Sequence, residues 1–231
     1  MEARNTFFIT GANRGIGLAL ARAAAAQGHR VIGTARNPDG ADDLRSVAHS
    51  VEQLDAASDE SCKALAATLA DEPVDVLINN AGISPKGSGD FATFDPDAFA
   101  DCLRTNAIGP LLVARALLPN LEAGNKKLIV QISSQMGSLG DAQRDANTGG
   151  LAYRSSKSAL NMASLLVANE LKPRGIACVM VHPGWVRTDM GGPEAHFGPE
   201  EAANAMLTTI DGLGPSSSGR FMRSDAEPIP W

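Results

Sequence analysis

The chain has 231 residues, a length at which one compact domain buries roughly 70–75% of its unfolded surface. Its 26 acidic and 20 basic residues exclude a strongly basic surface, so no nucleic-acid partner is expected. No apolar run is long enough to span a membrane, and the polar start at Met1–Asn5 does not resemble a secretory signal. The three cysteines lack metal or disulfide spacing. We therefore expect a cytoplasmic protein with neither a bound metal nor a membrane partner.

Short β-branched runs alternate with alanine- and leucine-rich helical runs along the chain. The expected strands are Thr6–Thr10, Arg30–Ala35, Val51–Leu54, Val74–Asn79, Lys127–Ser133, Ile176–His182 and Arg220–Met222. The expected helices are Ile16–Gln27, Ser58–Ala70, Phe99–Leu118, Leu151–Lys172 and Pro199–Leu213. This alternation predicts an α/β fold, a single doubly wound domain with a parallel sheet of about seven strands and helices on both faces. Ligands of such sheets bind at the carboxyl ends of the strands.

A glycine-rich segment, Thr-Gly-Ala-Asn-Arg-Gly-Ile-Gly at Thr10–Gly17, follows the first strand and opens the first helix. Unpaired N–H groups and the helix dipole favour a phosphate there, and glycine allows the phosphate to approach the backbone. The spacing differs from the usual G-x-G-x-x-G, and a plain strand-to-helix turn would also use glycines. The residues expected to hold the pyrophosphate of a dinucleotide are Gly11, Asn13, Arg14, Gly15, Ile16 and Gly17.

The end of the second expected strand indicates which dinucleotide binds. NAD-binding sites of this architecture place an acidic residue there to grip the ribose 2′-hydroxyl. Here the strand ends with Arg36, whose guanidinium can pair with a 2′-phosphate, and Arg14 could approach the same phosphate from the other side. NADP(H) is therefore favoured over NAD(H), although two solvated surface arginines would look the same in the sequence.

Tyr153 and Lys157 are spaced four residues apart at the start of a long expected helix, so their side chains share one face. A phenol has an ordinary pKa of about 10, and a nearby ammonium is expected to lower it. The pair could then donate a proton to a carbonyl oxygen or remove one from an alcohol. A capped helix with a chance Tyr-x-x-x-Lys pattern is the alternative.

Together these motifs resemble the short-chain dehydrogenase/reductase family, whose members have a Rossmann-type fold. The matching elements lie in the family order across nearly the whole chain: Thr10–Gly17, Asn79–Gly82, Asn106, Ser133–Ser134, Tyr153 with Lys157, and Pro183–Thr188. Within the family the chain is most similar to the small carbonyl reductases of the C-factor and sniffer type, whose chains end in a similar acidic, proline-tryptophan segment. Relatives often pair through helices, so a homodimer is favoured.

The resemblance implies a role for each matching residue. Tyr153 would be the general acid/base, and Lys157 would hold the nicotinamide ribose and lower the phenol pKa. Ser134, rather than Ser133, would hydrogen-bond the substrate oxygen, and Asn106 would interrupt its helix and anchor a water. Further cofactor contacts would come from Asp55, which could also be an ordinary loop carboxylate, and from Asn80, Ala81, Gly82, Pro183, Gly184, Val186 and Thr188.

Two departures from the family pattern concern the substrate side. The interval between Ser134 and Tyr153 is longer than usual, and the connection from Thr188 to Pro199 is short, which predicts an open, permissive site. We expect a cofactor half at about residues 1–125 and a catalytic and substrate half at about 126–231. The expected function is NADP(H)-dependent hydride transfer between the nicotinamide and a carbonyl or alcohol. A dinucleotide-binding signalling or sensor protein and an NAD-dependent alcohol dehydrogenase remain as alternatives.

Overall fold

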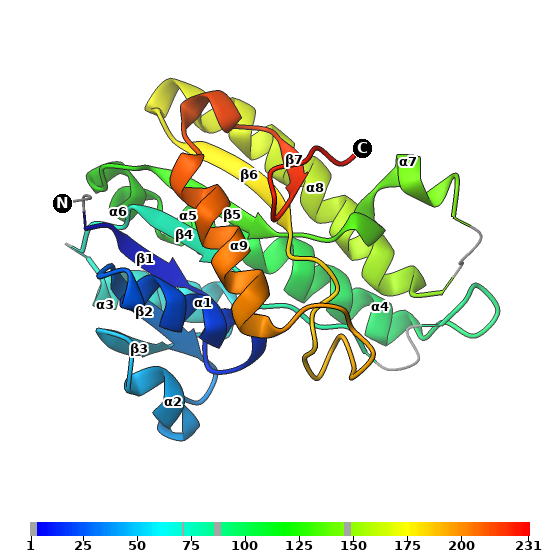
Figure 1. The fold of residues 1–231 in the computed structure, drawn as a ribbon, viewed down its shortest axis with the longest axis horizontal. Coiled ribbons are helices and arrows are strands. Elements are labelled where there is room, and N and C mark those ends of the chain that lie inside the picture. Colours follow the sequence, from blue (N-terminus) through cyan, green and yellow to red (C-terminus); the bar gives the residue numbers. More distant parts are fainter. Residues whose placement is uncertain (1–3, 71, 86–88, 146–148) are drawn as a thin grey trace.

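A seven-stranded parallel sheet forms the centre of the molecule (Figure 1). The computed structural model describes residues 4–70, 72–85, 89–145 and 149–231. The strand order is β3-β2-β1-β4-β5-β6-β7. The strands are β1 (Thr6–Ile9), β2 (Arg30–Ala35), β3 (Ser50–Gln53), β4 (Val76–Asn79), β5 (Leu128–Ile132), β6 (Ala177–His182) and β7 (Phe221–Arg223). The predicted doubly wound fold is confirmed.

Helices cover both faces of this sheet (Figure 1). One face packs against α1 (Gly15–Ala26) and α9 (Pro199–Gly212), and the other against α3 (Asp59–Thr68), α5 (Gly109–Ala116) and α8 (Leu151–Leu171). The shorter helices are η1 (Pro38–Gly40), α2 (Asp42–Arg45), α4 (Pro96–Leu103), η2 (Arg104–Ile108), α6 (Leu118–Ala123), η3 (Gln135–Gly137), α7 (Leu139–Ala142), η4 (Lys172–Arg174) and η5 (Pro215–Ser217).

Alternating side chains of each strand build two separate cores. In β5, Leu128 and Val130 pack toward α1 and α9, whereas Ile129 packs toward α5 and α8. All three are fully buried. Because both faces are covered, the central strands β1 and β4 are buried at every position rather than alternating with exposed residues. The carboxyl ends of β1, β4, β5 and β6 consequently meet at one edge, where the predicted motifs lie.

The expected single helix Phe99–Leu118 is wrong in its bounds and its continuity. Helix α4 begins earlier, at Pro96, because the Asp95 carboxylate caps it by accepting from the N–H of Asp97 at 2.9 Å. The π-helical turn η2 then interrupts the helix around Asn106 before α5 continues it. The sequence patterns also missed the short helices α2, α6 and α7, which are too brief for a clear period.

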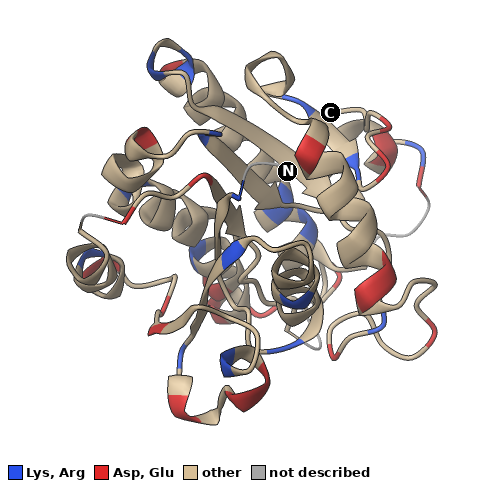
Figure 2. Cartoon of the chain, turned by 60° about the vertical axis from the view of Figure 1, so that its left-hand side comes forward, with Lys and Arg blue, Asp and Glu red and all other residues tan. Residues whose placement is uncertain are grey.

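Acidic and basic segments are interspersed over the view in Figure 2 rather than gathered on one side. Several form ion pairs between elements, such as Arg22 with Asp43 at 3.0 Å and Arg174 with Glu122 at 2.6 Å. None of the helices in the described ranges is long and apolar enough to cross a membrane. Part of the long interval between Ser134 and Tyr153, residues 146–148, lies outside those ranges.

Candidate active site

The glycine-rich turn between β1 and α1 depends on left-handed backbone conformations and on close packing. Gly11 and Gly15 have left-handed φ angles of 61° and 54°, which favour glycine. A Cβ added at Gly17 would overlap the carbonyl oxygen of Gly11 and lie 2.5 Å from Asn80 Nδ2. That Asn80 amide donates to the carbonyl oxygens of Thr10 and Gly11, at 2.9 and 3.1 Å. Asn80 therefore ties the turn to the loop after β4.

The start of α1 has the properties that a dinucleotide phosphate needs. Within the described part of the chain, Arg14 at the N-cap makes no side-chain capping bond and the first turn contains no acidic residue. The first N–H groups of the helix consequently face the glycine turn without a competing carboxylate. A Cβ added at Gly15 would lie 3.4 Å from the Thr188 methyl carbon, so the Pro183–Thr188 loop borders this turn. The turn residues fit a bound pyrophosphate.

The two arginines proposed for a 2′-phosphate have different surroundings. Arg14 forms an ion pair with Asp189 at 2.6 Å, with side chains 68% and 83% exposed. Arg36 is exposed just beyond β2, and among the described residues none forms an ion pair with it. Its guanidinium is therefore available to a phosphate, whereas Arg14 would have to leave Asp189.

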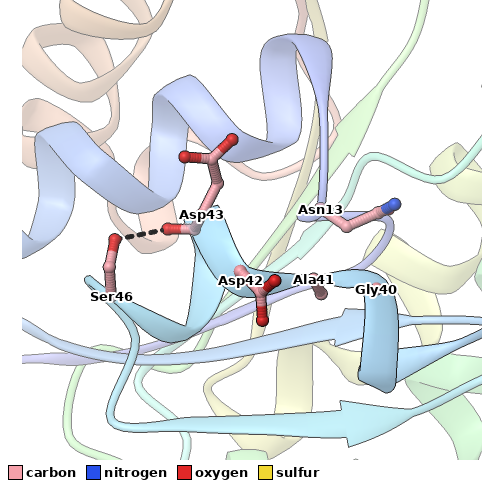
Figure 3. Close-up of a pocket in the computed structure, with 6 residues that line it drawn as sticks. All are labelled: Asn13, Gly40, Ala41, Asp42, Asp43 and Ser46. Carbon is pink, nitrogen blue, oxygen red and sulfur yellow. Dashed lines mark hydrogen bonds between the residues drawn. The ribbon is translucent and has the colours of Figure 1, made fainter.

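A surface pocket of about 430 Å³ lies between the glycine turn and α2 (Figure 3). Its lining residues are Asn13, Gly40, Ala41, Asp42, Asp43 and Ser46. Both of its carboxylates are paired with arginines, Asp42 with Arg45 and Asp43 with Arg22. The sequence patterns suggested only Asn13 here, because α2 is too short to be recognised. The predicted adenine contact Asp55 lies after β3, where its carboxylate accepts from the N–H of Ala57 at 3.0 Å.

Tyr153 and Lys157 lie in the first turns of α8, with Lys157 Nζ 5.7 Å from the centre of the Tyr153 ring. Lys157 is only 5% exposed and donates to the Ile132 carbonyl oxygen at the end of β5, at 2.8 Å. Burial lowers the pKa of Lys157 to about 8. Burial also raises the pKa of Tyr153 to about 12, against a smaller lowering by the hydrogen bond with Ser134.

The expectation that a nearby ammonium makes the Tyr153 phenol more acidic is therefore wrong for this structure. Desolvation disfavours the charged forms of both residues, and for Tyr153 it outweighs the lowering of the pKa by the hydrogen bond with Ser134. The spacing of four residues correctly predicted that the two side chains share a helix face, but spacing carries no information about burial.

The two serines after β5 have different partners. Ser133 Oγ is buried and donates to Asn161 Oδ1 at 2.5 Å. Ser134 Oγ accepts from the N–H of Met136 at 3.2 Å, and its hydrogen bond with Tyr153 lowers the phenol pKa. Ser134 thus lies beside the tyrosine, whereas Ser133 is turned toward α8.

Asn106, at the π-helical turn η2, is fully buried. Its Oδ1 accepts from the N–H of Ile83 at 2.8 Å, and its Nδ2 donates to the Ile83 carbonyl at 2.8 Å and to Ser156 Oγ at 3.0 Å. A Cβ added at Gly82 would lie 3.2 Å from Asn106 Oδ1 and 3.8 Å from Lys157 Nζ. Asn106 therefore fixes the loop after β4 against α8, close to the lysine, and its water-anchoring role stays a prediction.

The loop after β6 is compact. Gly184 has a φ of 89°, and Thr188 Oγ1 donates to the Val186 carbonyl at 3.4 Å and accepts from the N–H of Gly191 at 3.1 Å. The N–H of Phe197 returns to the Trp185 carbonyl at 3.0 Å, which closes the short connection to α9 on itself. The sequence patterns missed the bond between Phe197 and Trp185 because it joins residues twelve positions apart in a loop without a period.

The sheet order and the glycine turn after β1 are those of a dinucleotide-binding α/β fold, and Ser134, Tyr153 and Lys157 lie together at the same edge of the sheet. A model of the short chain dehydrogenase family matches residues 5–197, and the chain belongs to this family. The resemblance expected from the motifs is confirmed.

Individual relatives span most of the chain. It is 44% identical over 174 residues to C-signal of Myxococcus xanthus, covering 73% of this chain and 99% of that protein. The structure of the carbonyl reductase Sniffer of D. melanogaster is 32% identical with a TM-score of 0.90, covering 99% of this chain and 100% of that one. The NADPH-bound carbonyl reductase from chicken fatty liver is 32% identical with a TM-score of 0.91, covering 99% of each.

Proposed function

We propose that the protein is an NADP(H)-dependent carbonyl reductase that acts on small aldehydes or ketones. The observation that carries the proposal is the group of Ser134, Tyr153 and Lys157 at the carboxyl ends of β5 and the start of α8. The glycine turn lies at the same edge of the sheet, and within the residues that the structure describes no side chain caps the helix α1 that follows it. Two structural neighbours, the carbonyl reductases Sniffer and that of chicken fatty liver, support this substrate class.

Each residue of the site would have a distinct role in the reduction of the carbonyl. A bound nicotinamide supplies the hydride that reaches the carbonyl carbon. Tyr153, held as a neutral phenol by its raised pKa, donates its proton to the carbonyl oxygen, and the product is an alcohol. Ser134 donates a hydrogen bond to the same oxygen and stabilises the negative charge that develops there. Lys157, whose pKa of about 8 leaves it mostly protonated near neutral pH, would hold the ribose and the tyrosine in place.

Exposed Arg36 supports NADP(H) as the cofactor, because its guanidinium can pair with a 2′-phosphate that NAD(H) lacks. The chicken fatty liver enzyme is described as NADPH-bound and a short-chain dehydrogenase/reductase of Burkholderia multivorans as having bound NADP, which favours the same choice. We further propose a single domain and a homodimer. Met162 and Leu166 of α8 are 61% and 60% exposed and could lie in the dimer interface.

The test is a panel of aldehydes and ketones with NADPH, followed by the loss of nicotinamide absorbance, for the wild type and Tyr153→Phe. The wild type is expected to turn over, and the variant is expected to lose turnover while binding NADPH with an unchanged Kd. Turnover that survives in Tyr153→Phe would contradict the assigned acid. A lower KM for NADH than for NADPH would contradict the cofactor.

A second candidate is a dinucleotide-binding signalling protein, favoured by the name C-signal of a relative with 44% identity. The two candidates differ in their need for Tyr153 as an acid. A biological effect that persists undiminished in Tyr153→Phe, while turnover is lost, would support the signalling function over the enzymatic one.

A further inference from the structure

The segment that carries Ser134 lies directly on the helix that carries Lys157. We call residues 134–140 the serine segment. The Gly137 carbonyl accepts from Ser158 Oγ at 2.9 Å and from Asn161 Nδ2 at 3.4 Å. A Cβ added at Gly137 would lie 2.8 Å from the Lys157 carbonyl carbon. One side of the serine segment is therefore closely packed on α8.

The last residues of the sequence hold the other side of the serine segment. Ser138 Oγ donates to the Pro230 carbonyl oxygen at 2.6 Å, and the N–H of Gly140 donates to the main-chain oxygen of Trp231 at 2.6 Å. A Cβ added at Gly140 would lie 2.9 Å from that Trp231 oxygen. Both bonds join residues about ninety positions apart, so they exist only because the fold places these two segments together.

Pro230 and Trp231 are themselves fixed to the sheet. The preceding Ile229 is buried, and its N–H donates to the Phe221 carbonyl of β7 at 3.0 Å. The Trp231 ring packs on the Phe221 ring with centroids 5.7 Å apart. After β7 the chain turns, and the N–H of Arg223 donates to the Glu227 carbonyl at 2.8 Å to close this turn. The chain then runs back along β7 toward α7 (Figure 1). The oxygens that contact the serine segment are therefore anchored to a paired strand.

One 3₁₀ turn connects these contacts to Ser134. The N–H of Gly137 donates to the Ser134 carbonyl at 2.9 Å, and the N–H of Ser138 donates to the Gln135 carbonyl at 3.0 Å. The N–H of Met136 donates to Ser134 Oγ itself at 3.2 Å. A displacement at Ser138 would therefore move the Ser134 hydroxyl relative to Tyr153.

We propose that Pro230 and Trp231 are positioning residues, whose main-chain oxygens clamp the serine segment against α8 and so aim the Ser134 hydroxyl at Tyr153 and the substrate oxygen. The inference rests on the proposed function, because the assigned work of Ser134 belongs to that reaction.

The test compares the wild type with a chain that stops after Ile229, which keeps the buried Ile229 but removes both oxygens. Its kcat with NADPH and a carbonyl substrate is expected to fall about 10- to 100-fold, the range expected when reacting groups are displaced by about 1 Å. The Kd for NADPH is expected to stay within about twofold, because the glycine turn lies elsewhere on the sheet edge. Trp231→Phe, which keeps both main-chain oxygens and an aromatic ring, is the matched control and is expected to retain the wild-type kcat.

Two further measurements separate positioning from general damage. In the Ser134→Ala background the truncation is expected to lower kcat little further, since the hydroxyl that it misplaces is absent. Hydrogen exchange of residues 134–142 is expected to become faster in the truncated chain. Equal losses of kcat with and without the Ser134 hydroxyl, or unchanged hydrogen exchange, would overturn the inference. A wild type that fails to reduce any carbonyl would refute the proposed function instead, and hydrogen exchange would still decide whether the clamp exists.

Discussion

Replacing Lys157 with methionine should change how the stability of the protein depends on pH. Lys157 is 5% exposed, and burial lowers its pKa from 10.5 to about 8. At about 1.36 kcal/mol for each pH unit, that gap corresponds to about 3 kcal/mol of unfolding free energy. The folded wild type is destabilised by this amount whenever the Lys157 amine is protonated. The Lys157→Met variant has no charge there and is not destabilised in this way.

The direction in which stability changes with pH follows from the number of protons that the folded and unfolded chains bind. Between pH 8 and 10.5 the unfolded chain binds more protons at Lys157 than the folded chain, so the wild type becomes more stable as the pH rises. The cost is fully present below about pH 8. Tyr153 acts in the opposite direction, because a pKa raised from 10.0 to about 12 makes the folded chain lose stability above pH 10. The buried thiols of Cys62, Cys102 and Cys178, whose pKa values burial raises from 9.0, also lower the stability of the folded chain near pH 9 and above. The difference between Lys157→Met and the wild type cancels these contributions and isolates the lysine.

Urea unfolding at pH 7, 8, 9 and 10 measures the effect. The unfolding free energy of Lys157→Met minus that of the wild type is expected to decrease by about 2.5 kcal/mol across this interval, since other groups titrate equally in both proteins. Lys172→Met, which removes an exposed lysine, is the matched control for a lysine change by itself. A difference that stays constant from pH 7 to 10 would refute the conclusion that burial governs Lys157.

Three further substitutions test other parts of the site. Gly17→Ala is expected to abolish NADPH binding, measured by calorimetry, because the new Cβ has no room in the glycine turn, whereas Gly212→Ala, with no described atom within 4 Å of its Cβ, should bind normally. Asn106→Ala should lower the unfolding free energy by about 2–5 kcal/mol in urea, since it removes a fully buried amide and leaves the part-buried N–H and carbonyl of Ile83 without this partner; a loss below about 1 kcal/mol would contradict those contacts. Arg36→Ala should raise the Kd for NADPH roughly 10- to 100-fold and leave the Kd for NADH unchanged, and equal effects on both would exclude a 2′-phosphate contact.

The sequence predicted all seven strands, with bounds that differ from the structure by at most two residues at each end. Buried parallel strands are short apolar runs, and the loops between them contain glycine, proline and polar residues, so these signals are local. Helices were predicted less well where a capping side chain or a local change of backbone geometry sets their bounds, because the spacing of apolar residues does not record either. The cap at Asp95 starts α4 before the predicted helix, and the π-helical turn at Asn106 divides what the apolar pattern presents as one helix.

By itself the sequence determined the order of the elements, the glycine turn, and the spacing of Tyr153 and Lys157 on one helix face, because each depends on neighbours a few residues apart. The tertiary structure alone decided the burial that raises the pKa of Tyr153 and lowers that of Lys157. It also decided that Arg14 pairs with Asp189, 175 positions away, and that Ser138 pairs with Pro230, 92 positions away. Desolvation and long-range hydrogen bonds depend on which distant segments the sheet brings together, and no local pattern records that.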